Sequence, residues 1–175
     1  KLPVEARVLA SLALEPKASA SRVAKLLPQL DRAPNDEELL RLAQFPAEPG
    51  VGEALQALLT NEKSRAAVAE KLVAQRTKLD AKQIAPLLTE TAKQMLLASD
   101  AGTPARNENS GTAGKSARIT LALQLISGFQ LASLESDLVA LARSGTGPVP
   151  AGVGNSRSLI LTTLRDLRSG EADLF

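Results

Sequence analysis

Residues 116–143, SARITLALQLISGFQLASLESDLVALAR, decide the fold that the sequence predicts. In the first half of this stretch, large apolar side chains recur at spacings of three and four, which is typical of a helix with a wide apolar face. They form two adjacent stripes, Ile119, Leu123 and Ile126 beside Leu121, Leu125 and Phe129. We expect Ser116 to cap the start of this helix and Gly128 to take a left-handed conformation near its end.

The second half predicts another short helix that folds back on the first. We expect Ser133 to cap it, and Glu135 and Asp137 stand in its first turn, where negative charge is favourable. Its apolar side chains are again spaced by four and three, at Leu134, Leu138 and Leu141. Two helices with apolar faces this wide cannot bury them against each other alone, so the hairpin predicts further helices that pack against it.

Looser copies of the same pattern run through the rest of the chain. Ser19 is expected to cap the second helix, and Pro28 to kink it or end it. Asn35 with Glu38, and Asp80 with Gln83, have the spacing of capping boxes. The expected helices lie at about 3–14, 19–30, 35–45, 50–59, from 61 onward, 80–98, 116–128, 133–143 and 156–168. The sequence therefore predicts an all-α protein of eight or nine short helices.

Composition supports this fold class and excludes several functions. The chain is 44% hydrophobic and 2% aromatic, with no Tyr or Trp, and its apolar residues are mostly the helix formers Leu and Ala. It has no apolar run near the length that spans a membrane, so we expect no membrane insertion. A net charge of +2, with scattered basic residues, predicts no nucleic-acid partner. Without Cys or His, the chain lacks the ligands of common zinc sites, the CxxCH haem attachment and a His-based triad.

Two polar or glycine-rich segments interrupt the helices and are expected to be long loops. They are residues 100–115, DAGTPARNENSGTAGK, and residues 145–155, GTGPVPAGVGN. Each precedes a helix of the first kind in a hairpin, so in a regular solenoid both would emerge on the same edge. We expect this edge to be a contact surface.

The segment ITLALQLISGFQLASLESDLVALARS, with weaker matches at 4–30 and 61–98, resembles HEAT-like repeats. That resemblance implies an α-α superhelix over residues 1–175, as a single helical-repeat domain. The proline, aspartate and arginine positions typical of HEAT repeats are irregular here, so a non-repeating helical bundle stays an alternative.

The Ala- and Leu-rich composition is also similar to helical segments of large modular bacterial proteins, in which HEAT-like arrays join a propeller-type dehydrogenase module to a cytochrome c module. This similarity implies that the chain is a segment of a longer protein, that its partners are proteins such as neighbouring domains of the same chain, and that the parent is a periplasmic or exported oxidoreductase. No catalytic or haem-binding residue of those modules maps onto this sequence.

The segment that most resembles a known chemical motif is NSGTAGKS, residues 109–116. Gly114, Lys115 and Ser116 fit the end of a phosphate-binding loop, in which backbone amides and lysine hold phosphates. Asn109 stands where the first glycine belongs, and no apolar strand precedes the loop. Arg157, in the first turn after the second glycine-rich segment, is another candidate ligand for an anion, and Arg165 and Arg168 follow it on the same helix.

The remaining candidates have structural explanations. Glu37 with Glu38, and Glu135 with Asp137, are acidic pairs in first helical turns, where capping explains them, and Met95 falls on an apolar stripe. The sequence thus favours a non-enzymatic helical scaffold or spacer that contacts proteins and needs no cofactor or metal. The alternatives are a nucleotide- or phosphate-binding enzyme domain that uses Gly114, Lys115 and Ser116, and a helical bundle that holds a peptide helix in a groove.

Overall fold

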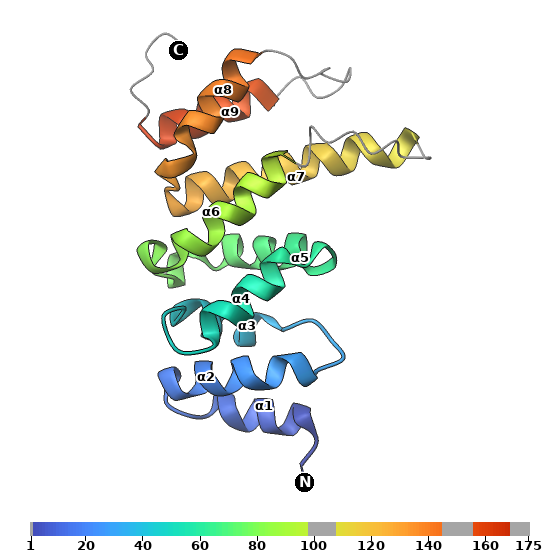
Figure 1. The fold of residues 1–175 in the computed structure, drawn as a ribbon, viewed down its shortest axis with the longest axis vertical. Coiled ribbons are helices and arrows are strands. Elements are labelled where there is room, and N and C mark those ends of the chain that lie inside the picture. The colour runs from blue at the N-terminus through green and yellow to red at the C-terminus, as the bar shows by residue number, and fades with distance from the viewer. Residues whose placement is uncertain (1, 98–107, 145–155, 169–175) are drawn as a thin grey trace. The chain divides into compact units, whose positions relative to one another are not determined.

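Nine α-helices and three short 3-10 helices, without a strand, make up the residues that this computed structural model describes, which are 2–97, 108–144 and 156–168 (Figure 1). The prediction of an all-α protein with eight or nine short helices is confirmed. The chain divides into two units, residues 1–87 and residues 88–175. The expectation of one domain over 1–175 stays a prediction, and each unit is described by itself.

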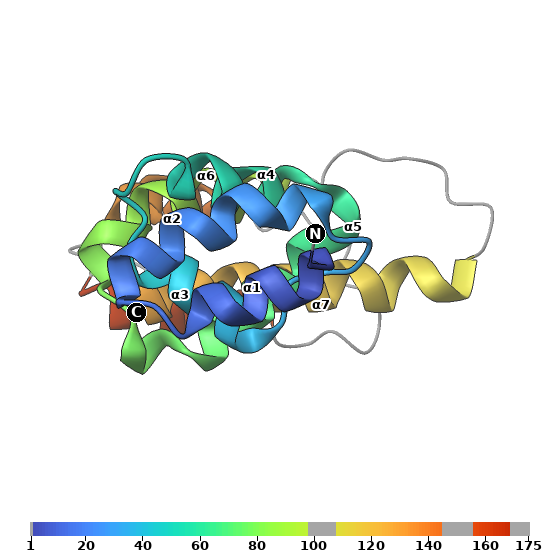
Figure 2. The ribbon, with the colours of Figure 1, turned by 90° about the horizontal axis from the view of Figure 1, so that it is seen from below.

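The first unit contains the helices α1 to α5 and the start of α6. Their bounds are Val4–Leu12, Pro16–Leu26, Asp36–Gln44, Val51–Thr60 and Glu62–Ala74, and α6 spans Ala81–Leu97 across the boundary between the units. Successive helices contact each other from α1 to α5, and contacts also join α2 to α4 and α3 to α5. Figure 2 shows α2 and α4 on one side of this unit and α1 and α3 on the other.

The core of the first unit consists of aliphatic side chains from each of these helices. Leu39, Leu42, Leu55, Leu59 and Leu72 are fully buried, and no aromatic side chain is among the core residues of this unit. Burial of each leucine contributes on the order of 2 kcal/mol. The leucine spacing that predicted the helices therefore also supplies the contacts that hold them together.

Prolines set the length of α2. Pro16 occupies the first turn of the helix, where its missing N–H costs nothing, and Pro28 falls in a 3-10 turn, Leu27–Gln29, that follows the end of the helix at Leu26. The expectation that Pro28 ends the helix is confirmed. The expectation that Ser19 caps it is wrong, because the helix starts at Pro16 and the side chain of Ser19 lies inside it, fully buried.

Local caps behave largely as the sequence predicts. Asn35 and Glu38 form a capping box at the start of α3, and Asn61 accepts a hydrogen bond from the backbone N–H of Lys63 at the start of α5. Asp80 accepts hydrogen bonds from the N–H of Lys82 and from the side-chain amide of Gln83, so it caps α6 without the reciprocal bond of a full box.

The second unit contains the rest of α6, then α7 (Glu108–Phe129), α8 (Glu135–Ser144) and α9 (Ser156–Asp166). Contacts join α9 to both α7 and α8. The two helices predicted from residues 116–143 are present, and most of their apolar stripes is buried, with Leu125, Ile126, Phe129 and Leu138 fully or nearly fully enclosed. Ile119 and Leu141, near the outer ends of the stripes, are half-buried. Instead of a direct cap at Ser133, a 3-10 turn, Ala132–Leu134, leads into α8.

The end of α7 differs from the expectation. Gly128 lies inside the helix, and the left-handed residue is Gln130, with φ of 53°. The N–H of Leu131 donates to the carbonyl of Ile126 at 3.0 Å, and the Leu131 side chain is buried. Burial of Leu131 fixes where the chain must turn, so the residue before it adopts the strained conformation although it is not glycine.

The start of α7 also differs. The helix begins at Glu108, so residues 108–115 of the expected loop have a helical backbone, and Ser116 is an internal residue of the helix and not its cap. Extending an existing helix costs much less free energy than nucleating a new one. The helix formed by the apolar segment can therefore extend backwards through the polar residues 108–115. The rest of that expected loop, and the expected loop at 145–155, lie outside the described residues.

Candidate functional site

The carboxylate of Glu38 on α3 is buried and accepts three hydrogen bonds. Arg32 donates from Nη2 to Glu38 Oε1 at 2.7 Å and from Nη1 to Glu38 Oε2 at 2.9 Å. The backbone N–H of Asn35 donates to Oε2 at 2.8 Å. The Glu38 side chain is fully buried, whereas 36% of the Arg32 side chain is exposed. The paired guanidinium and the helix cap together compensate the cost of burying this charge.

Arg32 also reaches a second helix. Its Nε donates to Glu5 Oε1 on α1 at 3.0 Å, and its Nη1 donates to the carbonyl of Ala33 at 3.0 Å. One guanidinium therefore joins α1, the segment before α3, and α3 itself. Sequence reasoning singled out Glu38 as a capping residue but gave no role to Arg32 or Glu5, since they lie 27 positions apart and share no local pattern.

The electrostatics of this cluster favour a structural role. Hydrogen bonds from Arg32 lower the pKa of Glu38; burial opposes this effect, and the bond from the Asn35 N–H adds to it. The two carboxylates raise the pKa of Arg32. A general acid or base works best with a pKa near the working pH, and Glu38 is shifted away from it. The Glu37–Glu38 pair thus separates into an exposed residue and a buried carboxylate that is paired with Arg32.

A second set of polar contacts holds the start of α3 from another helix. On α5, Lys71 Nζ donates to the carbonyl of Pro34 at 3.0 Å and lies 2.9 Å from Asp36 Oδ1. Gln75 Nε2 on α5 donates to the carbonyl of Asp36 at 3.1 Å. The N-terminal end of α3 is therefore bound by α5 on one side and through Arg32 by α1 on the other.

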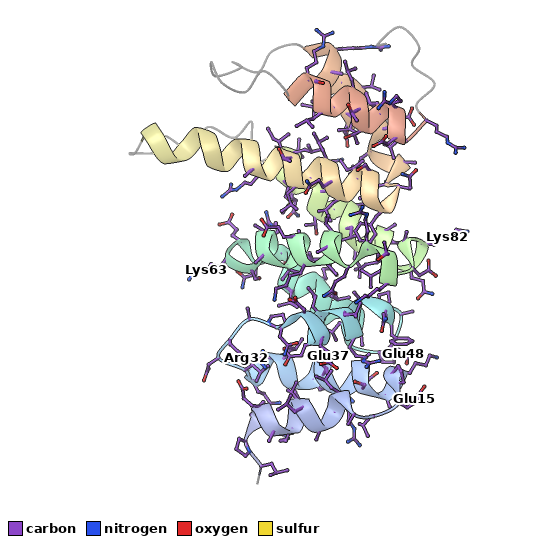
Figure 3. All side chains as sticks on the ribbon, turned by 180° about the vertical axis from the view of Figure 1, so that it is seen from behind. Glu15, Arg32, Glu37, Glu48, Lys63 and Lys82 are labelled. Carbon is purple, nitrogen blue, oxygen red and sulfur yellow. The ribbon has the colours of Figure 1, made fainter. Side chains whose placement is uncertain are left out.

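The opposite end of these helices has its own ion pair. Lys17 Nζ in the first turn of α2 lies 3.0 Å from Glu48 Oε1 in the turn before α4, and this contact raises the pKa of Lys17. Figure 3 shows Arg32 at one edge of the first unit and Glu48 with Glu15 at the other. Both edges of the unit thus carry ion pairs between elements that are distant in the sequence.

The phosphate-loop-like segment has a helical backbone in the structure. Gly114, Lys115 and Ser116 lie within α7, downstream of its start at Glu108. In a phosphate-binding loop, the glycine-rich backbone curls so that successive N–H groups point at the phosphates, and the helix begins only at its end. The backbone seen here does not have that form. The side chains of these three residues lie outside the described part of the structure.

Arg157 lies in the first turn of α9, as expected, and shares a surface with Arg165. These two arginines, together with Ser158, Leu161 and Thr162, border an open hollow on the outer side of the helix. Ile160 and Leu164 are buried on the opposite side. The sequence singled out these arginines, with Arg168, as a set that could contact phosphates. The hollow beside them is apparent only in the structure.

The remaining candidates are structural. Met95 is buried in the core, as predicted. Asp137 lies 3.8 Å from Lys93 Nζ, which joins the first turn of α8 to α6 within the second unit. Within the described ranges, no group of three or more Asp or Glu residues is placed to hold a metal ion. None of the described helices is long and apolar enough to cross a membrane.

The fold is all-α, and the ion pairs of Arg32, Lys17 and Lys71 connect different helices or the turns beside them. No family model, curated protein or solved structure matches the chain. Its function is therefore inferred from its own residues.

Proposed function

We propose that the chain is a non-enzymatic helical-repeat module, of the HEAT-like kind, that docks proteins or spaces domains within a larger protein. The observation that carries this proposal is the pattern of contacts in the first unit. From α1 to α5 each helix contacts the next, and α2 with α4 and α3 with α5 also contact each other. Such contacts between neighbours and next neighbours are what a stack of short helix pairs requires.

The ion pairs of the first unit support the same proposal. Arg32, Lys17 and Lys71 each reach a group on another helix or in the turn before it. These contacts hold neighbouring elements in register, which is the requirement of a scaffold. A site for chemistry would instead bring reactive groups together around a space for substrate.

The resemblance to modular bacterial proteins suggests what the module contacts. A segment between a propeller-type dehydrogenase module and a cytochrome c module would touch those neighbouring domains, in a parent that is an oxidoreductase. On this proposal the chain itself carries neither the catalytic residues nor the haem. The edge formed by residues 100–115 and 145–155 remains our proposed contact region, and α9 directly follows the second of these segments.

The test is affinity capture with the purified chain as bait in an extract of its source organism, followed by binding of each purified captured protein to the chain. A helical protein of similar size and net charge serves as control bait. Saturable binding of a protein that the control does not retain supports a docking module. If nothing binds the chain in preference to the control, the docking proposal is wrong.

A further inference from the structure

The outer face of α9 differs in chemistry from the face that packs inside the second unit. Ile160, Thr163 and Leu164 are buried, and α9 contacts α7 and α8. On the other side, Arg157, Ser158, Leu161, Thr162 and Arg165 border the open hollow. This set, called the α9 face below, combines two guanidinium groups with a half-buried leucine between them.

The two arginines of the α9 face are available for a ligand. In the described part of the chain, neither Arg157 nor Arg165 takes part in an ion pair, in contrast to Arg32. Thr162 Oγ1 donates to the carbonyl of Ser158, so this hydroxyl is already used within the helix. Roughly two helical turns, about 12 Å along the axis, separate the two arginines.

We infer that the α9 face binds an acidic helical segment of a protein partner. Arg157 and Arg165 would each pair with a carboxylate, and Leu161 would contact an apolar side chain between them. Acidic residues two turns apart on one face of a docked helix are separated by about 11 Å, within reach of both arginines. Guanidinium groups bind carboxylates through two parallel hydrogen bonds, and arginine is enriched at protein interfaces.

The charge of the second unit favours this ligand over a nucleic acid. Residues 88–175 contain eight Lys and Arg residues and eight Asp and Glu residues, so the net charge of the segment is zero. A polyanion is attracted by a broad positive field, and single strands are also held by stacking on aromatic rings. The chain has no Tyr or Trp. Two discrete positive charges around a leucine fit two discrete carboxylates around an apolar side chain.

This inference rests on the proposed docking function, and its test uses the whole chain with a defined probe. The probe is a fluorescein-labelled helical peptide with two Glu residues seven positions apart and a Leu between them, and its counterpart has Gln in place of Glu. In fluorescence anisotropy at low salt, we expect the Glu peptide to bind about tenfold more tightly than the Gln peptide, and high salt to remove the difference.

The decisive variant combines Arg157→Glu with Arg165→Glu. We expect it to lose about tenfold or more in affinity for the Glu peptide, because both attractive contacts become repulsive. The matched control is Arg7→Glu with Arg22→Glu, which makes the same charge change at exposed positions of α1 and α2 and should leave binding unchanged. Far-UV circular dichroism of both variants establishes that each is folded.

Three outcomes overturn the inference: equal binding of the Glu and Gln peptides, equal loss in both double variants, or tighter binding of a single-stranded DNA oligonucleotide that depends on the same two arginines. The proposed function fails in a different way. If a captured partner binds the wild type and the α9 variant equally, the docking function stands and the α9 face is not its site. If the wild type captures no partner, the docking function itself is lost.

Discussion

Replacement of Arg32 by methionine removes the cation from the buried carboxylate of Glu38 and keeps most of the aliphatic volume. The Glu38 side chain is fully buried, and two of its three short hydrogen bonds come from this guanidinium. After the substitution only the bond from the N–H of Asn35 remains. The variant therefore tests whether the Arg32–Glu38 pair stabilises the first unit or contributes nothing measurable to its stability.

The expected loss in the free energy of unfolding follows from the unequal exposure of Arg32 and Glu38. Removal of one member of a buried ion pair costs about 3–5 kcal/mol, because the other charge stays behind without compensation. Arg32 is partly exposed, and the Asn35 bond survives, so we expect Arg32→Met to lower the free energy of unfolding by about 3 kcal/mol. Glu38→Gln leaves a guanidinium that reaches water and keeps an oxygen for Asn35, so its cost should be only about 1–2 kcal/mol.

Glu5→Gln is the matched control, because Glu5 bonds the same guanidinium at a similar distance of 3.0 Å. Its side chain is 61% exposed, and exposed ion pairs contribute about 0–1 kcal/mol. Urea unfolding, followed by circular dichroism at the helical band, measures all three variants. A double-mutant cycle should give a larger coupling for Arg32 with Glu38 than for Arg32 with Glu5.

The pH dependence has a definite sign. Because the pKa of Glu38 is lowered in the folded state, its stabilising contribution is complete above the ordinary carboxyl pKa of about 4.3 and is lost as the pH falls through the folded value. In Arg32→Met, burial without the cation should raise this pKa instead. The stability gap between wild type and variant should therefore be largest near neutral pH and shrink below about pH 4.

The reasoning would be refuted if Arg32→Met and Glu5→Gln had equal, small effects at neutral pH. It would also be refuted if Glu38→Gln lowered the free energy of unfolding more than Arg32→Met does. The unpaired buried charge would then not be the main cause of the loss in stability. A gap between wild type and Arg32→Met that is independent of pH would assign the loss to packing of the arginine stem and not to its charge.

Ser19→Ala should raise the free energy of unfolding by about 1 kcal/mol in urea titration, because the buried Ser19 hydroxyl has no hydrogen-bond partner among the described residues. Ser11→Ala should raise it less, since Ser11, which is also buried, donates to the carbonyl of Arg7 at 2.7 Å. Gly50→Ala should lower the free energy of unfolding by about 1 kcal/mol, because Gly50 has φ of 79°, a conformation that alanine adopts only with strain. Gln130→Gly should raise it by about 0.5 kcal/mol in the same assay, because glycine adopts the positive φ of this position without strain. Lys115→Ala should leave thermal unfolding with and without millimolar MgATP unchanged under the scaffold proposal; a midpoint that MgATP raises in the wild type and not in the variant would favour the nucleotide-binding alternative.

Much of the fold could be predicted because its signals are local. The capping box joins Asn35 and Glu38, only three positions apart, and the leucine spacing along each helix requires no knowledge of the partner helix. Helix ends were harder to predict. The position of Gln130 depends on the burial of Leu131, and the start of α2 depends on Pro16 and not on the serine within the helix. At each of these two helix ends, the sequence offers two residues that could begin or end the helix, and tertiary packing decides which of them does.

The candidate sites were less accessible from the sequence. A helical period relates Arg157 to Arg165, so the α9 face could be drawn on a wheel, but the hollow beside it depends on packing. The Arg32 cluster has no sequence signature, because its three side chains come from α1, α3 and the segment between α2 and α3. Contacts between distant residues carry no periodicity, so pattern reasoning could find the cap but not the cation that completes it.

The Glu38 carboxylate links the cap of α3 to the contact with α1. Glu38 Oε2 accepts bonds from both Arg32 Nη1 and the N–H of Asn35, so the cap of α3 and the long-range ion pair share one oxygen. The same guanidinium holds Glu5 on α1. When the Arg32 guanidinium is displaced, the buried Glu38 carboxylate loses its counter-charge, and its burial becomes more unfavourable. Displacement of Arg32 therefore also weakens the cap of α3, which depends on the same carboxylate. The stability of α3 and the position of Arg32 beside α1 are therefore coupled through one carboxylate, and a local helix signal becomes part of the contact between successive helices.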